Sequence, residues 1–549
     1  MFDPDIMRAF EELKAIWDPD DRMNPGKVVH PYRLDENLRL GAEFRPPSLS
    51  TRFRYPDDKG SFSYAMERCV GIGECRRLDG GTMCPSYMVT REEQHSTRGR
   101  ARLLFEMIRG DSIRDGWKSE AVHEALDLCL SCKGCKSECP VNVDMATYKA
   151  EFLSHYYQHH TRPRAAYAFG LVYWWARLAA VFPGLANLFI RTPILSRLMK
   201  WAAGVDARRT LPVFAPVTFR QWWQPRPVRG QGRPMVLLWV DTWSNHWQPA
   251  VAIAAVEALE DAGFQVVVPR QSLCCGRPLY DPGMLDLARR MLVQILDAVR
   301  PALRAGVPIV GLEPSCISVF RDELPSFFPD RPDAKRLEQQ SFMLGEFLLN
   351  HAPGWKPPRL ARKALVQGHC HHKAVLDFEH QDAALFDELG LDADVLDAGC
   401  CGMAGGFGYE KAHYAVSIAC GERQLAPAIR DAPDDTIIIA DGFSCREQIQ
   451  HQTHRRALHT AQVLQMARQQ GPLGPAGPRP ERGHAGVRLP VPWTRRLRNA
   501  ALIAMAAGGA YAIVRARRRR QPWSRASTRS MSRRETRLPM RSRSPPSSR

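Results

Sequence analysis

Most of this 549-residue sequence carries almost no net charge. Residues 471–549 hold 19 arginines and two glutamates and so carry +17 of the formal charge of +18, which leaves about +1 for residues 1–470. A nearly neutral body lacks the basic surface that nucleic-acid binding requires, so we expect no nucleic-acid partner. Residues 471–549 are Pro/Arg-rich, and we predict that they form a largely disordered tail.

The sequence also lacks a secretory leader and a long apolar run. Its start, MFDPDIMRAFEELK, is acidic and amphipathic, so we expect a cytoplasmic protein. Residues 178–190 and 499–514 form uncharged runs of 13 and 16 residues, both shorter than the roughly 20 residues of a spanning helix. Two interpretations of residues 499–514 stay open: a frayed helix in the tail, or a marginal anchor at the cytoplasmic face of a membrane beside the arginines of residues 515–520.

Cysteine is absent before residue 69 and after residue 445. Most of the 15 cysteines fall into tight groups with C-x-x-C or Cys-Cys spacing. Such spacings suit metal ligation in a reducing compartment better than a secreted disulfide framework. The sequence therefore predicts metal sites within residues 69–445.

One cysteine group forms a complete iron–sulfur motif. CLSCKGCKSECP, residues 129–140, is C-x-x-C-x-x-C-x-x-x-C-P. In bacterial ferredoxins such a run places three thiolates round one cluster, and its fourth cysteine ligates another cluster. We therefore predict a 4Fe-4S cluster held by Cys129, Cys132 and Cys135, with Cys84 of the upstream Cys-Pro pair as the fourth ligand.

A second group is incomplete. Cys69 and Cys75 belong to a C-x-x-C-x-x-C pattern whose middle position is Ile72. The exchange of fourth cysteines between the two motifs adds Cys139 as the third ligand of this set. Three alternatives stay open: a 3Fe-4S cluster, a 4Fe-4S cluster with another ligand such as Asp79, or no second cluster. The spacing resembles the three-iron motif of succinate dehydrogenase and fumarate reductase iron–sulfur subunits, although the motif order is inverted here.

Two arginines lie between the two cysteine motifs, in STRGRARLL. Arg98 and Arg100 are expected to bind a cluster by lining its surface with positive charge. A solvated helix face is an equal alternative for both side chains.

Residues 233–470 are predicted to contain two copies of an α/β unit. Each copy alternates strands and helices, with Cys-Cys-Gly after the second strand and a further cysteine after the third. The Cys-Cys pairs are 126 residues apart and the later cysteines 129 residues apart. Because open α/β sheets place their sites at the carboxyl ends of strands, we expect these cysteines to gather in each copy. They are Cys274, Cys275 and Cys316 in the first copy and Cys370, Cys400, Cys401 and Cys445 in the second.

The Cys-Cys-Gly segments resemble the cysteine-rich CCG domains of heterodisulfide reductase subunits, glycolate oxidase iron–sulfur subunits and lactate-utilisation proteins. Both copies depart from that pattern. PSCIS and SCREQ each carry a single cysteine instead of C-x-x-C, and the first copy has no counterpart of Cys370. A non-cubane iron–sulfur cluster and a redox-active or substrate-facing cysteine face both stay open. We expect His369, His371 and His372 to be hydrogen-bonding side chains rather than ligands.

The N-terminal stretch FEELKAIWDPDDRMNPGKVV, residues 10–29, resembles the extreme C-terminus of FAD-linked 2-hydroxy acid dehydrogenases of the vanillyl-alcohol-oxidase type. Together with the cysteine motifs, it makes residues 10–465 similar to the iron–sulfur half of oxidoreductases of the D-lactate, glycolate and D-2-hydroxyglutarate dehydrogenase type. The resemblance implies that FAD lies on a partner dehydrogenase polypeptide or on a missing N-terminal domain. It also implies that electrons pass from the flavin to a quinone or another carrier.

The expected fold is α+β and multidomain. The expected parts are a flavoprotein remnant (1–35), a helical ferredoxin-type two-cluster domain (36–160), apolar helices and a linker (161–232), two CCG repeats (233–355 and 356–470) and the tail (471–549). We expect an oxidoreductase component for electron transfer, with a peripheral membrane contact and no catalytic base of its own. A heterodisulfide-type thiol–disulfide reductase is the alternative, and a non-functional gene fragment is a third interpretation.

Overall fold

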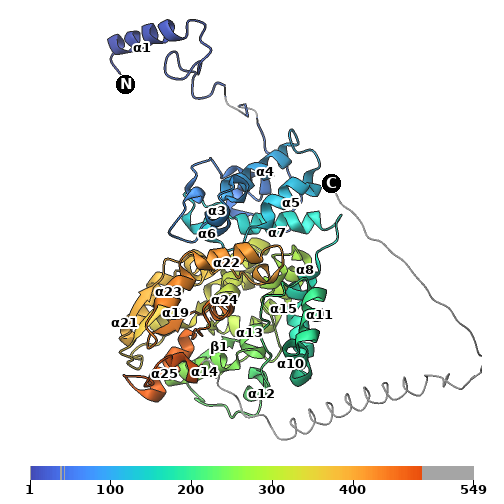
Figure 1. The fold of residues 1–549 in the computed structure, drawn as a ribbon, viewed down its shortest axis with the longest axis vertical. Coiled ribbons are helices and arrows are strands. Elements are labelled where there is room, and N and C mark those ends of the chain that lie inside the picture. The colour runs from blue at the N-terminus through green and yellow to red at the C-terminus, as the bar shows by residue number, and fades with distance from the viewer. Residues whose placement is uncertain (1, 38–39, 42–43, 485–549) are drawn as a thin grey trace, which may run out of the picture. The chain divides into compact units, whose positions relative to one another are not determined.

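Two parallel β-sheets organise the C-terminal half of the chain (Figure 1). The first sheet has the order β2-β1-β3-β4, and the second has the order β6-β5-β7. In both, the first strand in sequence is central and is flanked by the second and third. The strands are β1 (Met235–Trp239), β2 (Gln265–Val267), β3 (Ile309–Gly311), β4 (Ser341–Met343), β5 (Lys363–Val366), β6 (Asp392–Val395) and β7 (Ile437–Ile439).

The central strands are short apolar runs, as strands covered on both faces usually are. Four of the five residues of β1 are buried, and β7 consists of three buried isoleucines. In register, Leu237 of β1 pairs with Val267 and Ile309, and Val366 of β5 pairs with Val395 and Ile439. The shared strand order supports the predicted repeat, and that both copies are CCG domains stays a prediction.

Helices connect and cover these strands. In the first α/β unit they are α13 (Thr242–His246), α14 (Pro249–Asp261), η5 (Arg277–Leu279), α15 (Leu285–Arg304), α16 (Pro314–Ser318), η6 (Val319–Glu323), α17 (Leu324–Phe327), α18 (Pro332–Gln339) and α19 (Leu344–His351). In the second they are α20 (Cys370–Val375), η7 (Glu379–Ala383), α21 (Ala384–Leu389), η8 (Phe407–Tyr409), α22 (Tyr414–Glu422), α23 (Leu425–Asp431), α24 (Phe443–Thr453) and α25 (Thr460–Gln470), followed by η9 (Pro480–Gly483).

The cysteine-rich region before the sheets is helical and packs on the second α/β unit through α3 and α22 (Figure 1). Side-chain caps fix where its helices begin, since Ser96, Ser119 and Asp144 each accept a backbone N–H at the start of α4, α5 and α7. Its elements are η1 (Pro56–Asp58), α2 (Phe62–Glu67), η2 (Glu74–Arg76), α3 (Pro85–Thr90), η3 (Glu93–His95), α4 (Thr97–Arg109), η4 (Gly116–Lys118), α5 (Glu120–Asp127), α6 (Gly134–Glu138) and α7 (Met145–Tyr156). The N-terminal helix is α1 (Pro4–Trp17).

Short helices link the cysteine-rich region to the first sheet. They are α8 (Arg164–Gly170), α9 (Val172–Ala179), α10 (Pro183–Arg191), α11 (Pro193–Ala203) and α12 (Phe219–Trp223). They lie in the region that the sequence predicts to be apolar, but many of their large side chains are exposed rather than buried.

A computed structural model describes residues 2–37, 40–41 and 44–484, all within one compact unit, Met1–Pro490. The predicted helix at residues 499–514 and most of the predicted tail lie outside the described residues. Within the described ranges, no helix combines the length and the apolarity that a bilayer crossing requires. The fold mixes helices with parallel sheets, as the sequence predicts.

Candidate functional site

The complete cysteine run begins in a tight loop between α5 and α6, the ferredoxin-type loop, and continues through α6 to Cys139 at its C-terminal end. Ser131 and Lys133 turn this loop with left-handed backbone angles, φ of 51° and 63°. All four cysteines predicted to hold the first cluster line one small cavity of about 20 Å³: Cys84, Cys129, Cys132 and Cys135. The structure therefore brings together thiols from two distant segments, as the exchange of fourth cysteines requires.

Backbone donors and burial suit this cavity to a metal cluster. The Thr97 N–H lies 3.0 Å from Cys84 Sγ at the start of α4, so it favours a thiolate there. Burial raises the pKa of Cys135 to about 12. Because a metal ligand must be a thiolate, a thiol held in such surroundings is one that only a bound metal would keep deprotonated. The residues present fit an iron–sulfur cluster.

The second thiol group lies beside the first. Cys69 lies within electrostatic range of both Cys75 and Cys139, and the Arg98 N–H approaches Cys75 Sγ at 3.3 Å. A hydrogen bond with Cys84 lowers the pKa of Cys75 to about 6, so the two groups touch. Ile72 is 58% exposed.

The other candidate ligands and the two arginines differ in placement. Asp79 is exposed and lies within electrostatic range of Arg423. Arg98 reaches the carbonyl of Gly71 and pairs with Glu93. Arg100 is buried and hydrogen-bonds to the backbone of α5 and to Ser86, rather than facing solvent.

The cysteines of the α/β units gather beyond the carboxyl ends of their strands. In the first unit, Cys274 hydrogen-bonds Cys275, whose Sγ lies 3.0 Å from Cys316 Sγ. In the second unit, contacts run from Cys370 to Cys400, from Cys400 to Cys401 and from Cys401 to Cys445. The hydrogen bond from Cys400 lowers the pKa of Cys370 to about 7. Each copy thus forms one thiol cluster, as expected.

Two further groups have ligand atoms within 4.8 Å of one another. One is His369, Cys370 and His371, and the other is His372, Asp382 and Asp441. His371 hydrogen-bonds to the Ser131 carbonyl at 3.0 Å, which agrees with the expected hydrogen-bonding role of this side chain.

A cavity of about 350 Å³ joins these clusters. Its wall contains Cys129 of the ferredoxin-type loop and both Cys-Cys pairs, together with Glu313 and His369. The Glu313 carboxylate accepts hydrogen bonds from Ser315 and from the backbone of Phe443, and burial raises the pKa of Glu313. Apolar side chains of α8–α11 form another part of the wall. The cavity therefore combines thiols, a carboxyl group able to hold a proton and an apolar lining.

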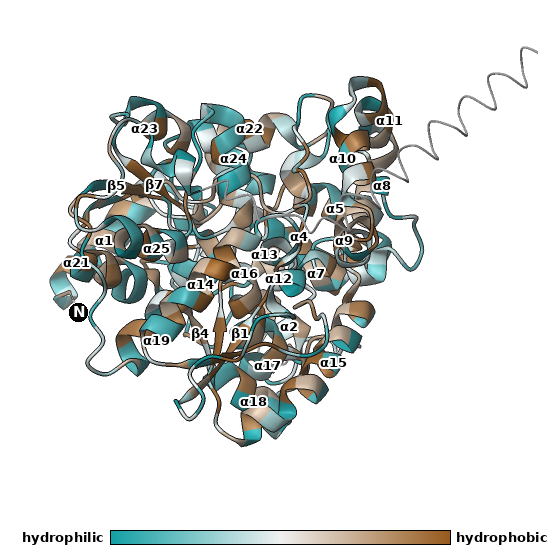
Figure 2. Ribbon diagram, turned by 90° about the horizontal axis from the view of Figure 1, so that it is seen from below, coloured by the Kyte–Doolittle hydropathy of each residue, from teal (hydrophilic) through white to brown (hydrophobic). Residues whose placement is uncertain are grey.

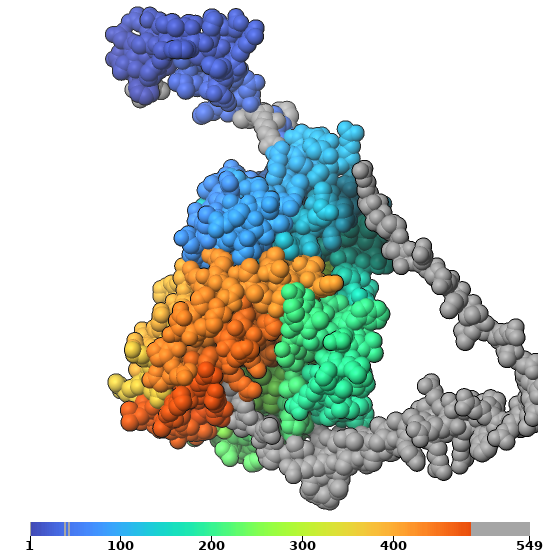
Figure 3. Space-filling model, viewed as in Figure 1, coloured from blue at the N-terminus to red at the C-terminus, as the bar shows by residue number. Residues whose placement is uncertain are grey.

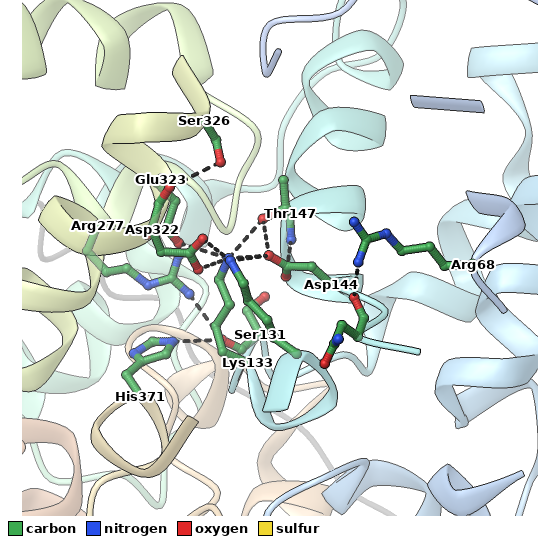
Figure 4. Close-up of polar contacts among 12 residues, drawn as sticks. Arg68, Ser131, Lys133, Asp144, Thr147, Arg277, Asp322, Glu323, Ser326 and His371 are labelled. Atoms are coloured by element: carbon green, nitrogen blue, oxygen red, sulfur yellow. Dashed lines mark hydrogen bonds and ion pairs between the residues drawn. The ribbon is translucent and has the colours of Figure 1, made fainter. Parts of the chain in front are cut away.

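Polar contacts fix the ferredoxin-type loop to both α/β units (Figure 4). The Ser131 carbonyl accepts hydrogen bonds from Arg277 of the first unit at 3.2 Å and from His371 of the second unit. Next to it, the fully buried Lys133 ammonium contacts Asp144 and Asp322 at 2.8 Å and Glu323 at 3.4 Å. These contacts hold Cys129, a predicted ligand of the first cluster, in the wall of the cavity.

Sequence reasoning missed this anchoring set. Its members are Ser131, Lys133, Asp144, Arg277, Asp322 and Glu323. Lys133 lies within the cysteine motif, at a position to which the motif gives no role. Its partners lie up to 190 residues further along the chain, and no sequence pattern links them to it. The buried Cys420 was also unassigned, and it packs with Cys132, Cys370 and Cys400.

Two family models match parts of the chain. Residues 65–143 match the 4Fe-4S dicluster domain, and residues 242–321 match the cysteine-rich domain called CCG. The first match covers Cys69 to Cys139, and the second covers the first α/β unit from α13 to η6.

Known proteins with similar sequences include dehydrogenases and a dehydrogenase subunit. D-2-hydroxyglutarate dehydrogenase of Escherichia coli (strain K12) is 26% identical over 527 residues, which cover 84% of this chain and 49% of that protein. One subunit of the anaerobic glycerol-3-phosphate dehydrogenase of the same strain is 26% identical over 293 residues, which cover 52% of this chain and 72% of that polypeptide. Lactate utilization protein A of Bacillus velezensis is 28% identical over 243 residues, which cover 42% of this chain and 98% of that protein.

The chain spans about half the length of the D-2-hydroxyglutarate dehydrogenases that it matches. The matched domains and the names of these relatives agree with the resemblance found in the sequence. The chain thus carries a 4Fe-4S dicluster domain and a cysteine-rich CCG domain, and it is homologous to iron–sulfur-containing dehydrogenases and dehydrogenase subunits.

Proposed function

We propose that this chain is the electron-transfer component of an FAD-dependent 2-hydroxy acid dehydrogenase and that it reduces a quinone or another carrier in the 350 Å³ cavity. The observation that carries the proposal is the wall of this cavity, where the ferredoxin-type loop and both Cys-Cys pairs meet. The similarity to D-2-hydroxyglutarate dehydrogenases and the N-terminal resemblance support a flavoprotein as electron donor.

The proposed ligand sets are those predicted from the sequence. Cys84, Cys129, Cys132 and Cys135 would hold a 4Fe-4S cluster, and their shared small cavity supports this set. The second set, at Cys69, would hold a 3Fe-4S or a 4Fe-4S cluster. The Cys-Cys-Gly thiols would hold a further cluster or face the substrate, and the boundaries of the two CCG repeats are part of the same proposal.

The proposed electron transfer conserves electrons and protons. A 2-hydroxy acid loses two electrons and two protons to become a 2-oxo acid, and a quinone takes up two of each to become a quinol. Bound iron–sulfur clusters supply one-electron transfer over a wide range of potentials. Glu313, which burial keeps protonated to a higher pH than usual, would give a proton to the acceptor in the cavity.

The side chains around the loop would keep the donor and acceptor sites in place. Arg277 and His371 hold the Ser131 carbonyl, so the loop cannot move without breaking contacts to both α/β units. The backbone N–H groups of Thr97 and Arg98 point at Cys84 and Cys75 and would stabilise negative charge on the thiolates.

The test uses the full chain, prepared anaerobically, together with an FAD-dependent 2-hydroxy acid dehydrogenase polypeptide. Addition of D-2-hydroxyglutarate, D-lactate or glycolate should reduce a soluble quinone only when both polypeptides are present. The Cys275–Cys316 thiol pair favours thiol–disulfide reduction as a second candidate function. Disulfide reduction by this chain without any flavoprotein would establish that candidate and overturn the first.

The role of Glu313 has its own test. Glu313→Gln should slow quinone reduction by roughly 100-fold because the proton donor is lost. Reduction of ferricyanide, which takes one electron and no proton, should stay unchanged. The matched control is Glu388→Gln, an exposed position outside the cavity wall. Equal losses with quinone and ferricyanide would contradict a proton-donating role.

A further inference from the structure

Helices α8–α11 present an apolar outer face. Figure 2 shows hydrophobic residues along α10 and α11, and Figure 3 shows these helices as a continuous teal-to-green surface. Ile194, the most exposed of the large side chains there, is 81% exposed. The others are Tyr167, Trp174, Trp175, Leu178, Leu185, Leu188, Phe189, Leu198 and Trp201. An exposed apolar patch of this kind marks an interaction surface.

The same segment is free of acidic residues. Residues 152–205 contain no aspartate or glutamate, and their basic residues are Arg162, Arg164, Arg177, Arg191, Arg197 and Lys200. Arg177, Arg191 and Arg197 are exposed. Throughout the part of the chain that the structure describes, no ion pair joins these three to a carboxylate. The face is therefore both apolar and positively charged, which complements an anionic lipid surface.

Aromatic and basic side chains stack on this face. The Arg164 guanidinium lies 4.9 Å from the Trp201 ring centre, and the Arg177 guanidinium lies 5.3 Å from that of Tyr173. Tryptophan and arginine prefer the headgroup level of a bilayer, where one part of the side chain is wet and the other apolar. Each of the four helices has 11 residues or fewer, so they can lie on a bilayer but not cross it.

The inner face of these helices lines the large cavity. Its lining includes Phe169, Val172, Ile190 and Met199. One layer of helices therefore separates the exposed apolar face from the cysteines of the cavity wall. An apolar acceptor dissolved in a bilayer would need to pass only this layer to reach them.

We propose that the outer faces of α8–α11 dock on an anionic lipid bilayer and that this bilayer supplies the apolar electron acceptor to the cavity. The docking is inferred from the exposed residues of α8–α11 alone. The supply of the acceptor rests on the proposed function.

Sedimentation with vesicles tests the docking. The full chain is mixed with phosphatidylcholine/phosphatidylglycerol vesicles at about 0.1 M and about 1 M salt, where the Debye length falls from roughly 10 Å to roughly 3 Å. The high salt removes attraction that comes only from the basic residues after position 470. We expect the chain to stay bound at high salt, because apolar side chains inserted into the bilayer are not screened.

Paired variants locate the contact. Ile194→Glu with Leu198→Glu should weaken high-salt binding at least about tenfold, since two apolar side chains no longer enter the bilayer. The matched control, Val228→Glu with Leu473→Glu, changes two residues of similar exposure elsewhere and should bind like the unchanged chain. If the first pair impairs folding, Leu178→Ser on α9 gives the same test with a smaller effect.

Two results would overturn the docking proposal: complete release of the unchanged chain at high salt, or equal high-salt binding by the variant and control pairs. Neither measurement needs a substrate, so the docking proposal is tested independently of the proposed function. Ferricyanide reduction with the flavoprotein should be the same for both pairs, whereas reduction of a long-chain quinone in vesicles should fall only for Ile194→Glu with Leu198→Glu.

Discussion

Lys133 offers the sharpest test of how the chain holds its ferredoxin-type loop. Its side chain is fully buried and contacts the carboxylates of Asp144, Asp322 and Glu323 as well as the hydroxyl of Thr147. Burial alone would lower the pKa of Lys133, but the three carboxylates raise it well above its ordinary value. The side chain is therefore charged at neutral pH, and Lys133→Met would remove that charge from beside the carboxylates.

The expected loss of stability follows from the remaining partners. Breaking a buried ion pair by removing one side chain typically costs about 3–5 kcal/mol, because the other charge stays buried. Lys136 still pairs with Asp322, and Arg277 lies 3.7 Å from Glu323, so the lower end applies. We expect Lys133→Met to reduce the free energy of unfolding by about 3 kcal/mol, and the iron content after purification should fall as the loop loosens.

Anaerobic thermal unfolding at one scan rate measures this effect. The control is Arg300→Met. Arg300 pairs with Asp297 and Asp333 at the surface, where an ion pair is worth about 0–1 kcal/mol. Adding Asp144→Asn to Lys133→Met should recover part of the loss, because asparagine can still cap α7 without a buried charge. The reasoning is refuted if Lys133→Met unfolds at the same temperature as Arg300→Met, or if the added substitution recovers nothing.

Three further predictions concern the clusters and one carboxylate. Ile72→Cys should replace the near-isotropic paramagnetic resonance signal of an oxidised three-iron cluster by that of a four-iron cluster and lower its reduction potential; an unchanged spectrum would show that Ile72 does not occupy a ligand position. Cys132→Ser should lose iron and sulfide, whereas Cys420→Ser should keep both, as measured by metal and acid-labile sulfide analysis, and equal losses would contradict the ligand set. A hydrogen bond from Arg208 lowers the pKa of Asp206 from 3.8 to about 2, so its stabilising effect is complete above about pH 4 and disappears as pH falls towards 2. Asp206→Asn should flatten the fall of the melting temperature in that window, and an unaltered pH profile would exclude the contribution.

Local patterns in the sequence predict the parts of the site that depend on spacing. The Cys-Pro at Cys84 and the run from Cys129 to Cys139 predict which thiols come together, because ferredoxin-type loops exchange their fourth cysteines. The alternation of strands and helices in the sequence also predicts that the Cys-Cys pairs follow the second strand of each copy, β2 and β6. These inferences need only neighbouring residues.

The rest depends on contacts between distant segments. Nothing near Lys133 in the sequence indicates that Asp322 lies 2.8 Å away, or that Arg100 turns inward to Ser86. The sequence predicts apolar helices within residues 161–232, but it does not predict that large side chains on the outer face of α8–α11 are exposed. Periodicity shows that a helix has an apolar face, but it does not show whether the rest of the chain covers that face.

The double hydrogen bond at the Ser131 carbonyl also sets an order of events in time. Its donor His371 follows 240 residues after Ser131, which corresponds to roughly 12–48 s of synthesis at about 5–20 residues per second. Until that histidine has left the ribosome, the loop that carries Cys129 and Cys132, two of the first cluster's predicted ligands, lacks one of its two hydrogen-bond donors. The iron–sulfur delivery machinery would therefore meet a finished loop only when the second α/β unit has folded, and cluster insertion would be a late step in the maturation of this chain.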